Sequence, residues 1–229
     1  RIFRAADDRV KYYNSHEHTY FNKRATLFGL NLAKKAIQQH QAVLIVEGYL
    51  DCITMHQAGF KNTVSTLGTA CTNEHIDILA RLAEKIQVLY DSDKAGLAAV
   101  EKLATLCWNA NLEIQVVELP TGEDPASYLA NNLAEQTIHL KKLISEAKDI
   151  YRFVISKTTS QFANQNLSKK IDVSSKIIEM IGKVVDPIKR NILLQEAAQA
   201  LGMSIDLLTT QKSSHTHPAL TINQRENHK

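Results

Sequence analysis

Short apolar runs alternate with helical patterns from residue 43 to about residue 130 of the chain. Four runs have the length of buried strands, at 43–46, 63–67, 86–90 and 114–119. Between them, apolar residues recur at helical spacing over about 49–58, 72–82 and 95–109. Strands that alternate with helices in this way predict an α/β fold, in which a parallel sheet is flanked by helices.

The pattern becomes helical from about residue 131 onwards. Glycine is rare there, and candidate helices cover 133–160, either continuous or broken, then 168–183 and 187–201. Asp186 before Pro187 is typical of a helix start. We therefore expect four parts. They are an N-terminal segment (1–40), an α/β metal-binding domain (41–130), an all-helical subdomain (131–211) and a disordered tail (212–229).

Carboxylates follow two of the predicted strands. Glu47 comes directly after 43–46, and Asp91 and Asp93 come after 86–90. Ligands of parallel α/β sheets bind beyond the carboxyl ends of the strands, so these side chains are expected to meet at one sheet edge. Carboxylates about 4 Å apart repel by roughly 4 kcal/mol at an effective dielectric near 20, and a proton or a cation must offset this. Oxygen ligands without His or Cys suit Mg²⁺ or Mn²⁺, which predicts a metal site with catalytic potential.

Three more side chains are candidates beside this site, and each has a plainer alternative. Asp51 shares a helical face with Glu47 if the helix has begun there, and it would then orient a neighbouring ligand; alternatively it only favours the helix N-terminus. Asp124, before Pro125, is a candidate fourth ligand or an ordinary turn residue. Lys94 would bind a phosphate oxygen or simply pair with Asp91 or Asp93.

The net charge is only +3, but it is unevenly distributed. Residues 1–40 carry 8 Lys and Arg against 3 Asp and Glu, residues 41–130 carry 5 against 12, and residues 131–229 carry 14 against 9. An acidic centre between basic flanks is typical of a metal site beside surfaces for an anionic polymer. A solvated surface with uneven charge is the alternative interpretation.

Composition narrows the class of protein further. No apolar run approaches the roughly 18 residues of a membrane span, so we expect no membrane association. The three cysteines (Cys52, Cys71 and Cys107) are odd in number and have no zinc-site spacing, which favours a reduced, cytoplasmic protein with buried thiols. His16, Glu17 and His18 lack the further ligands that a closed metal site needs.

Several stretches together resemble a known family. Glu47-Gly48-Tyr49-Leu50-Asp51 and Asp91-Ser92-Asp93-Lys94-Ala95-Gly96 resemble the paired acidic motifs of the Toprim fold, which bacterial primases, topoisomerases and some nucleases share. Further stretches resemble bacterial DNA primases of the DnaG type: Lys11-Tyr12-Tyr13-Asn14-Ser15 with Lys23, Ser65-Thr66-Leu67-Gly68-Thr69 with Thr72, Gly122-Glu123-Asp124-Pro125, and the helical tail with Asp186-Pro187. The similarity extends over about residues 10–208.

This resemblance implies synthesis of short RNA primers on a single-stranded DNA template from ribonucleoside triphosphates. Glu47, Asp91 and Asp93 would hold divalent metals for in-line phosphoryl transfer, with Asp124 as a further ligand. Lys11, Asn14 and Lys23, together with Lys94, would bind nucleotide phosphates or DNA. Residues 1–40 would be a remnant of the N-terminal part of the primase core.

The chain also departs from the family pattern. Ala126-Ser127 stands where the family usually carries another aspartate. The zinc-binding domain, the first part of the polymerase core and the region that binds the replicative helicase are expected to lie outside this chain. The rival interpretations are a Toprim nuclease or topoisomerase fragment, and a non-catalytic module that binds DNA or a replication partner.

Overall fold

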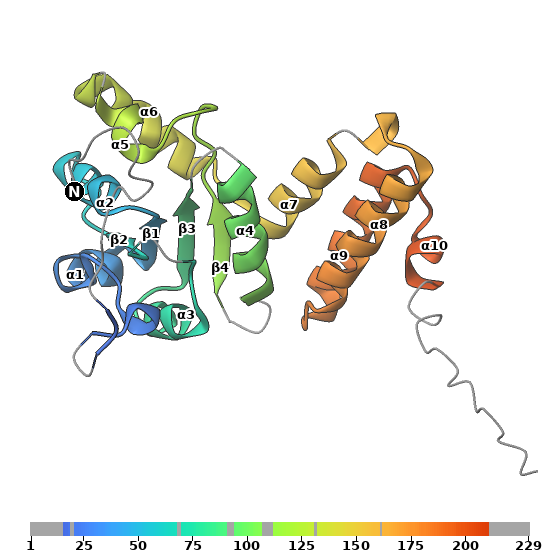
Figure 1. The fold of residues 1–229 in the computed structure, drawn as a ribbon, viewed down its shortest axis with the longest axis horizontal. Coiled ribbons are helices and arrows are strands. Elements are labelled where there is room, and N and C mark those ends of the chain that lie inside the picture. The colour runs from blue at the N-terminus through green and yellow to red at the C-terminus, as the bar shows by residue number, and fades with distance from the viewer. Residues whose placement is uncertain are drawn as a thin grey trace, which may run out of the picture.

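The computed structural model describes residues 16–18, 21–67, 70–90, 94–106, 112–130, 132–160 and 162–210. They form a sheet flanked by helices, followed by a group of helices (Figure 1). The sheet has the strand order β2-β1-β3-β4-β5. Its strands are β1 (Ala42–Val46), β2 (Thr63–Ser65), β3 (Lys85–Leu89), β4 (Glu113–Val116) and β5 (Lys148–Asp149). The first four strands are mutually parallel, and β5 is antiparallel to β4.

Helices cover both faces of the sheet. The helices are α1 (Leu30–His40), α2 (Tyr49–Gln57), α3 (Asn73–Ala80), α4 (Lys94–Leu106), α5 (Pro125–Ala130), α6 (Leu133–Ser145), α7 (Ile150–Thr159), α8 (Leu167–Gly182), α9 (Pro187–Leu201) and α10 (Ile205–Thr210), with short 3-10 helices η1 (Lys23–Ala25) and η2 (Phe162–Asn164). Successive side chains of β1 point to opposite faces of the sheet, as the pleat of a strand requires. Val43 and Ile45 pack with α1, α3, α4 and α7, whereas Leu44 and Val46 pack with α2, α5 and α6.

The predicted α/β fold is confirmed, and most predicted elements lie within a few residues of the observed ones. The helix predicted over 187–201 has these same bounds. Asp186 caps it by accepting hydrogen bonds from the N–H groups of Ile188 and Lys189, and Gly202 ends it in the left-handed conformation at a φ of 63°. The side chain of Thr72 likewise accepts from the N–H of His75 at the start of α3.

Among the strands and α-helices, α5 and β5 were not predicted. The stretch around Pro125 was interpreted as a turn-rich loop, but the short helix α5 begins there. The helical pattern predicted over 133–160 is two helices, α6 and α7, separated by β5. β5 adds an antiparallel edge strand to the predicted parallel sheet, with Gln115 in register with Asp149 and Val116 with Lys148.

The C-terminal helices share one hydrophobic core with a face of the sheet. Val154 on α7, Ile177 on α8 and Ala197 on α9 are almost fully buried and belong to the same cluster as Ile86 and Val88 of β3. Figure 1 shows α7 between α4 on one side and α8 and α9 on the other. The domain boundary predicted near residue 130 stays a prediction. Leu140 of α6 packs in the core on the sheet face opposite the one that α7 covers. The predicted disordered tail from 212 lies outside the described residues.

Among the described helices, none combines the length and the apolar character that crossing a membrane requires.

The position of α6 gives a test of the core that it shares with α2 and α5. Leu140 is fully buried, whereas Ile138 on the same helix is 68% exposed. Replacing a buried leucine by alanine removes its burial and leaves a cavity. We expect Leu140→Ala to lower the free energy of unfolding in urea by about 2–5 kcal/mol, and Ile138→Ala to change it by less than about 0.5 kcal/mol. Equal effects of the two variants would contradict this packing of α6.

Candidate metal and nucleotide site

Glu47 lies where β1 ends, beside the ends of its two neighbouring strands. Val46 is in register with Ser65 of β2 and with Leu89 of β3. The hydroxyl of the buried Ser65 donates a hydrogen bond to the carbonyl oxygen of Glu47 over 2.8 Å. The backbone that carries Glu47 is therefore held against β2, and the segment after Leu89 leaves the sheet at the same edge.

Asp51 connects two loops at this edge. The residue is 8% exposed and counts among the buried polar residues. The N–H of Gly48 donates to Oδ2 over 3.1 Å, and the N–H of Ala126 donates to Oδ1 over 3.2 Å. A carboxylate that is removed from water needs such donors to offset its lost hydration. Asp51 thus joins the start of α2, next to Glu47, to the start of α5, next to Asp124.

Gly48 is required by this arrangement. A Cβ atom at position 48 would lie 2.7 Å from Oδ2 of Asp51, which is closer than real Cβ atoms approach other heavy atoms. Any other residue at position 48 would push the Asp51 carboxylate away from its backbone donors. Glycine at position 48 therefore leaves the space in which the Asp51 carboxylate contacts the loop of Asp124.

Asp124 is the N-terminal cap of α5. Its Oδ1 accepts from the N–H of Ser127 over 2.6 Å, and the Ser127 hydroxyl is within hydrogen-bond distance of a carboxylate oxygen of Glu123. This is the local role that the alternative interpretation gave to Asp124. The cap also fixes the direction in which this carboxylate leaves the loop.

Lys23 lies in η1, which packs against the start of α3. Its neighbour Arg24 is exposed and lies 4.0 Å from a carboxylate oxygen of Glu74, an exposed pair of little energetic weight. The side chain of Asn22 caps η1 by accepting from the N–H of Arg24. The backbone at Lys23 is therefore held beside the start of α3.

The remaining predicted site residues are placed only in part. Lys11, Asn14, Asp91 and Asp93 lie outside the described residues, and Lys94 is described only as the first residue of α4. Over the described ranges, no three His, Cys, Asp or Glu side chains are close enough together to hold a metal ion. Glu47 and Asp124 supply carboxylate oxygens, the donors that Mg²⁺ and Mn²⁺ prefer, so the residues present fit such an ion if the segment after Tyr90 completes the set.

The thiols near this edge are buried and protonated. Burial, and secondarily the charge of Asp51, raises the pKa of the Cys52 thiol to about 11. Burial raises the pKa of the Cys71 thiol to about 12. This confirms the prediction of buried thiols for Cys52 and Cys71; Cys107 lies outside the described residues.

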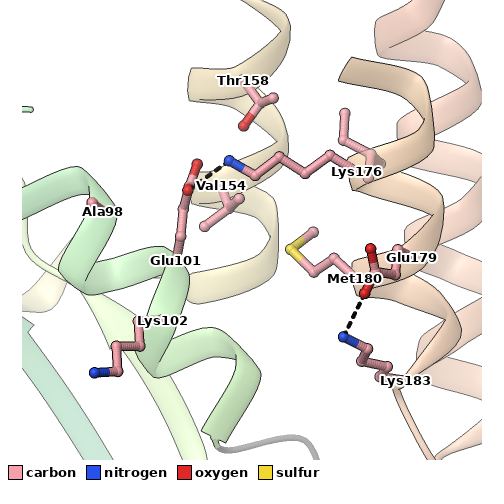
Figure 2. Close-up of a pocket in the computed structure, with 10 residues that line it drawn as sticks. Ala98, Glu101, Lys102, Val154, Thr158, Lys176, Glu179, Met180 and Lys183 are labelled. Carbon is pink, nitrogen blue, oxygen red and sulfur yellow. Dashed lines mark hydrogen bonds and ion pairs between the residues drawn. The ribbon is translucent and has the colours of Figure 1, made fainter. Parts of the chain in front are cut away.

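A separate cavity of about 340 Å³ lies between α4, α7 and α8. Figure 2 shows the apolar side chains of Val154 and Met180 with charged lining side chains around them. Lys176 of α8 lies 2.6 Å from a carboxylate oxygen of Glu101 on α4, which links the C-terminal helices to the α/β unit. The α4 residues that line this cavity come from the middle of the helix, whereas the candidate metal site lies where α4 begins.

Sequence reasoning missed several groups that build the site. Ser65 is a buried polar residue in a strand, and Ala126 contributes only its N–H group. The fully buried His75 contacts the backbone around Lys23. Ser65 belongs to a stretch that the sequence analysis singled out, but its contact with Glu47 was not predicted. Nothing local in the sequence indicates the partner of Ala126 or His75.

Comparisons with known proteins agree for both halves of the chain. A family model described as Toprim-like matches residues 44–129, and one described as the DnaB-helicase binding domain of primase matches residues 151–206. A DNA primase of Listeria innocua is 31% identical over 224 residues, which is 97% of this chain and 35% of the relative. The chain therefore spans about a third of the length of the curated relatives that it matches.

Solved structures give the same family. A DNA primase domain from Pseudomonas aeruginosa superposes with a TM-score of 0.75 at 28% identity, covering 90% of this chain and 64% of that one. A DnaG primase catalytic domain bound to single-stranded DNA superposes with a TM-score of 0.73 at 26% identity, covering 88% and 64%.

The sheet, its acidic edge and the first family model make this a protein of the Toprim fold. Within that fold, the matches over both halves place the chain in the family of bacterial DnaG-type DNA primases.

The matches describe the C-terminal helices in two ways. The family model over residues 151–206, which include α7, α8 and α9, is described as a helicase-binding domain and so differs from the expectation that the helicase-contacting region lies outside this chain. Two solved primase catalytic cores cover 89% and 87% of this chain, in agreement with the assignment of these helices to the catalytic core.

The double contact of Asp51 predicts a measurable cost when one acceptor is lost. In Asp51→Asn, an amide NH₂ replaces one carboxylate oxygen, so either Gly48 or Ala126 loses its acceptor. A buried donor without a partner costs about 1–3 kcal/mol, and we expect the free energy of unfolding to fall by that amount. Urea denaturation followed by circular dichroism measures it.

Asp77→Asn is the matched control, because Asp77 is an exposed carboxylate on α3. Its effect is expected to stay within about 0.5 kcal/mol. An Asp51→Asn variant as stable as this control would show that the two loops do not depend on the Asp51 carboxylate.

Proposed function

We propose that this chain is part of the catalytic core of a DNA primase, an RNA polymerase that makes short RNA primers on single-stranded DNA during replication in the cytoplasm. The observation that carries the proposal is the agreement between the site and the comparisons. Glu47 leaves β1 at the sheet edge where β3 leads into Asp91 and Asp93, and both halves of the chain match the primase family. The rival nuclease, topoisomerase and non-catalytic interpretations have no comparable support among the relatives.

Each acidic residue has a distinct task in this proposal. Glu47, Asp91 and Asp93 hold one or more Mg²⁺ or Mn²⁺ ions, with Asp124 as a further ligand from the start of α5. Asp51 keeps the loops of Glu47 and Asp124 together through Gly48 and Ala126. Bound divalent cations would stabilise the charge that develops during in-line phosphoryl transfer.

Basic residues bind the substrates in this proposal. Lys23, on η1, contacts phosphate groups of the template or of the incoming ribonucleoside triphosphate, together with Lys11, Asn14 and Lys94. A lysine ammonium group binds phosphate as a compact point charge, so it tolerates any base sequence. The support is the basic character of residues 1–40 and the bound single-stranded DNA of the solved relative.

Metal binding tests the proposal first. We expect the chain to bind Mn²⁺ in isothermal titration calorimetry, and the double variant Asp91→Ala with Asp93→Ala to lose this binding, because two of its ligands are gone. The control pair is Asp77→Ala with Asp172→Ala, two exposed carboxylates on α3 and α8. Absence of Mn²⁺ binding by the unmodified chain would refute a metal-dependent role for it.

Nucleotide and DNA assays then separate the proposal from its rivals. The chain is expected to bind ATP in the presence of Mn²⁺, and to bind a single-stranded oligonucleotide without cleaving it. Cleavage of DNA without nucleotides would support the Toprim nuclease interpretation instead.

We also propose that a replicative helicase of the DnaB type binds the C-terminal helices. The support is the helicase-binding family model over residues 151–206. Apolar side chains are exposed within this region, including Ile188 at 72% and Ile192 at 43% on α9. Such side chains become favourable contacts when a partner removes them from water.

Ile188→Ser combined with Ile192→Ser is expected to weaken binding to a bacterial DnaB-type helicase at least tenfold, which corresponds to about 1.4 kcal/mol. Biolayer interferometry measures the affinity. Leu32→Ser is the matched control, because Leu32 is also 72% exposed but lies on α1, outside the matched region. An equal loss in the control, or no loss in the double variant, would exclude this face of α9.

A further inference from the structure

His75 is a buried histidine whose two ring nitrogens both have backbone partners. It lies on α3 and is fully buried. Its Nε2 lies 3.0 Å from the carbonyl oxygen of Lys23 and 3.1 Å from that of Thr26. Its Nδ1 lies 3.3 Å from the backbone nitrogen of Thr72.

These partners determine where the ring proton lies. Carbonyl oxygens only accept hydrogen bonds, so Nε2 must donate to Lys23 and Thr26. The N–H of Thr72 only donates, so Nδ1 must accept. His75 is therefore neutral with its proton on Nε2. Burial lowers its pKa, against the opposing effect of the Lys23 and Thr26 carbonyls and of Glu74, which agrees with a neutral ring.

Thr72 adds a second contact to the same segment. Its hydroxyl donates to the carbonyl oxygen of Arg24 over 2.6 Å while accepting from the N–H of His75. The carbonyl groups of Lys23, Arg24 and Thr26 are thus all held by two side chains from the start of α3. These contacts join positions 48 to 52 residues apart in the sequence.

The other end of this segment is fixed to the acidic edge of the sheet. Phe28 and Ser65 exchange two backbone hydrogen bonds, of 2.9 and 3.1 Å. Ser65 in turn donates to the carbonyl oxygen of Glu47, and the Phe28 ring packs edge-on against Tyr49 on α2, with ring centroids 4.9 Å apart. Residues 23–28 are therefore held at one end by His75 and Thr72, and at the other by the strand next to Glu47.

We propose that His75 is a positioning residue, which holds the backbone of η1 so that Lys23 presents its ammonium group to the phosphates of a nucleic acid. This inference rests on the proposed function, in which Lys23 binds phosphate. Without the Nε2 donor, the carbonyls of Lys23 and Thr26 lose their partner. Binding of phosphate by Lys23 then has to order η1 as well, and the affinity falls.

Two conservative variants separate this role from the capping of α3. In His75→Gln, the amide NH₂ takes a place close to Nε2 and can still donate to the carbonyls of η1. In His75→Asn, the shorter side chain can still accept from the N–H of Thr72 through its oxygen, but it cannot reach η1. A residue needed only to cap α3 would be replaced better by Asn, and a residue needed to hold η1 would be replaced better by Gln.

The experiment measures binding of the whole chain to a fluorescein-labelled single-stranded oligothymidylate by fluorescence anisotropy at several salt concentrations. The variants are Lys23→Ala, His75→Asn, His75→Gln and Lys23→Ala combined with His75→Asn, all used well below their melting temperatures. Lys23→Ala is expected to weaken binding about threefold to tenfold and to reduce the salt slope by about 0.7, because one phosphate contact to a single strand is lost.

His75→Asn is expected to weaken binding by a similar factor and to reduce the salt slope in the same way, whereas His75→Gln stays within about twofold of the unmodified chain. Combining Lys23→Ala with His75→Asn is expected to add nothing to the effect of Lys23→Ala, since both act through one contact.

The possible failures are distinguishable. If Lys23→Ala leaves binding unchanged, the phosphate role of Lys23 is wrong, and the positioning role of His75 is wrong with it. If Lys23→Ala weakens binding but His75→Asn does not, or His75→Gln weakens it as much as His75→Asn, Lys23 keeps its role and His75 loses the one proposed here. Additive effects of the Lys23 and His75 substitutions would also overturn the proposal.

Discussion

The buried carboxylate of Asp51 is the constraint on which the acidic edge of this protein depends. It accepts hydrogen bonds from Gly48 and Ala126, and the residues that carry these donors are 3 and 75 positions away. The contact brings the end of β1 to the start of α5 without a covalent link. Because Asp51 is almost fully buried, loss of the hydrogen bond from Gly48 or from Ala126 would lower the free energy of unfolding. Gly48 belongs to the same unit, since a side chain at that position would occupy the place of the carboxylate oxygen.

A second set of contacts connects the basic N-terminal segment to the same edge. Ser65 bonds with Phe28 on one side and with Glu47 on the other, while His75 and Thr72 hold the backbone of η1. Positive and negative groups of a site for nucleotides must be fixed relative to each other, or binding has to order them first. In this structure, buried hydrogen bonds of neutral groups hold the backbone of both segments in place.

Much of the fold could be predicted because its signals are local. The continuous apolar run at β1, and the run at β3 that Gln87 interrupts, reflect strands covered on both faces. Asp186 before Pro187 indicated the start of α9. The same residue types, Asp124 before Pro125, start α5. The stretch was nevertheless interpreted as a turn-rich loop, because Pro120 and Gly122 come shortly before this pair. β5 has two residues, too few for any alternation of apolar and polar positions, and it exists only through its pairing with β4.

The site was predictable in its residue types but not in its supporting contacts. Glu47 follows an apolar run, so a carboxylate at a strand end was visible in the sequence. The role of Ala126 depends on a backbone N–H group, which every residue except proline has, so no residue type marks it. The partners of His75 lie about 50 positions away, and only the folded chain brings them together.

The most direct test of a metal site at this edge is Mn²⁺ titration of the ¹⁵N-labelled chain followed by NMR. Paramagnetic broadening falls steeply with distance from the ion, so it locates the site without relying on activity. We predict that the amide signals of Gly48 and Ala126 broaden first, at less than one equivalent of Mn²⁺, while those of Lys85 and Glu113, at the opposite ends of β3 and β4, stay sharp. Broadening that begins at Lys85 and Glu113, or that affects all amides equally, would contradict the placement of the metal at the carboxyl ends of the strands.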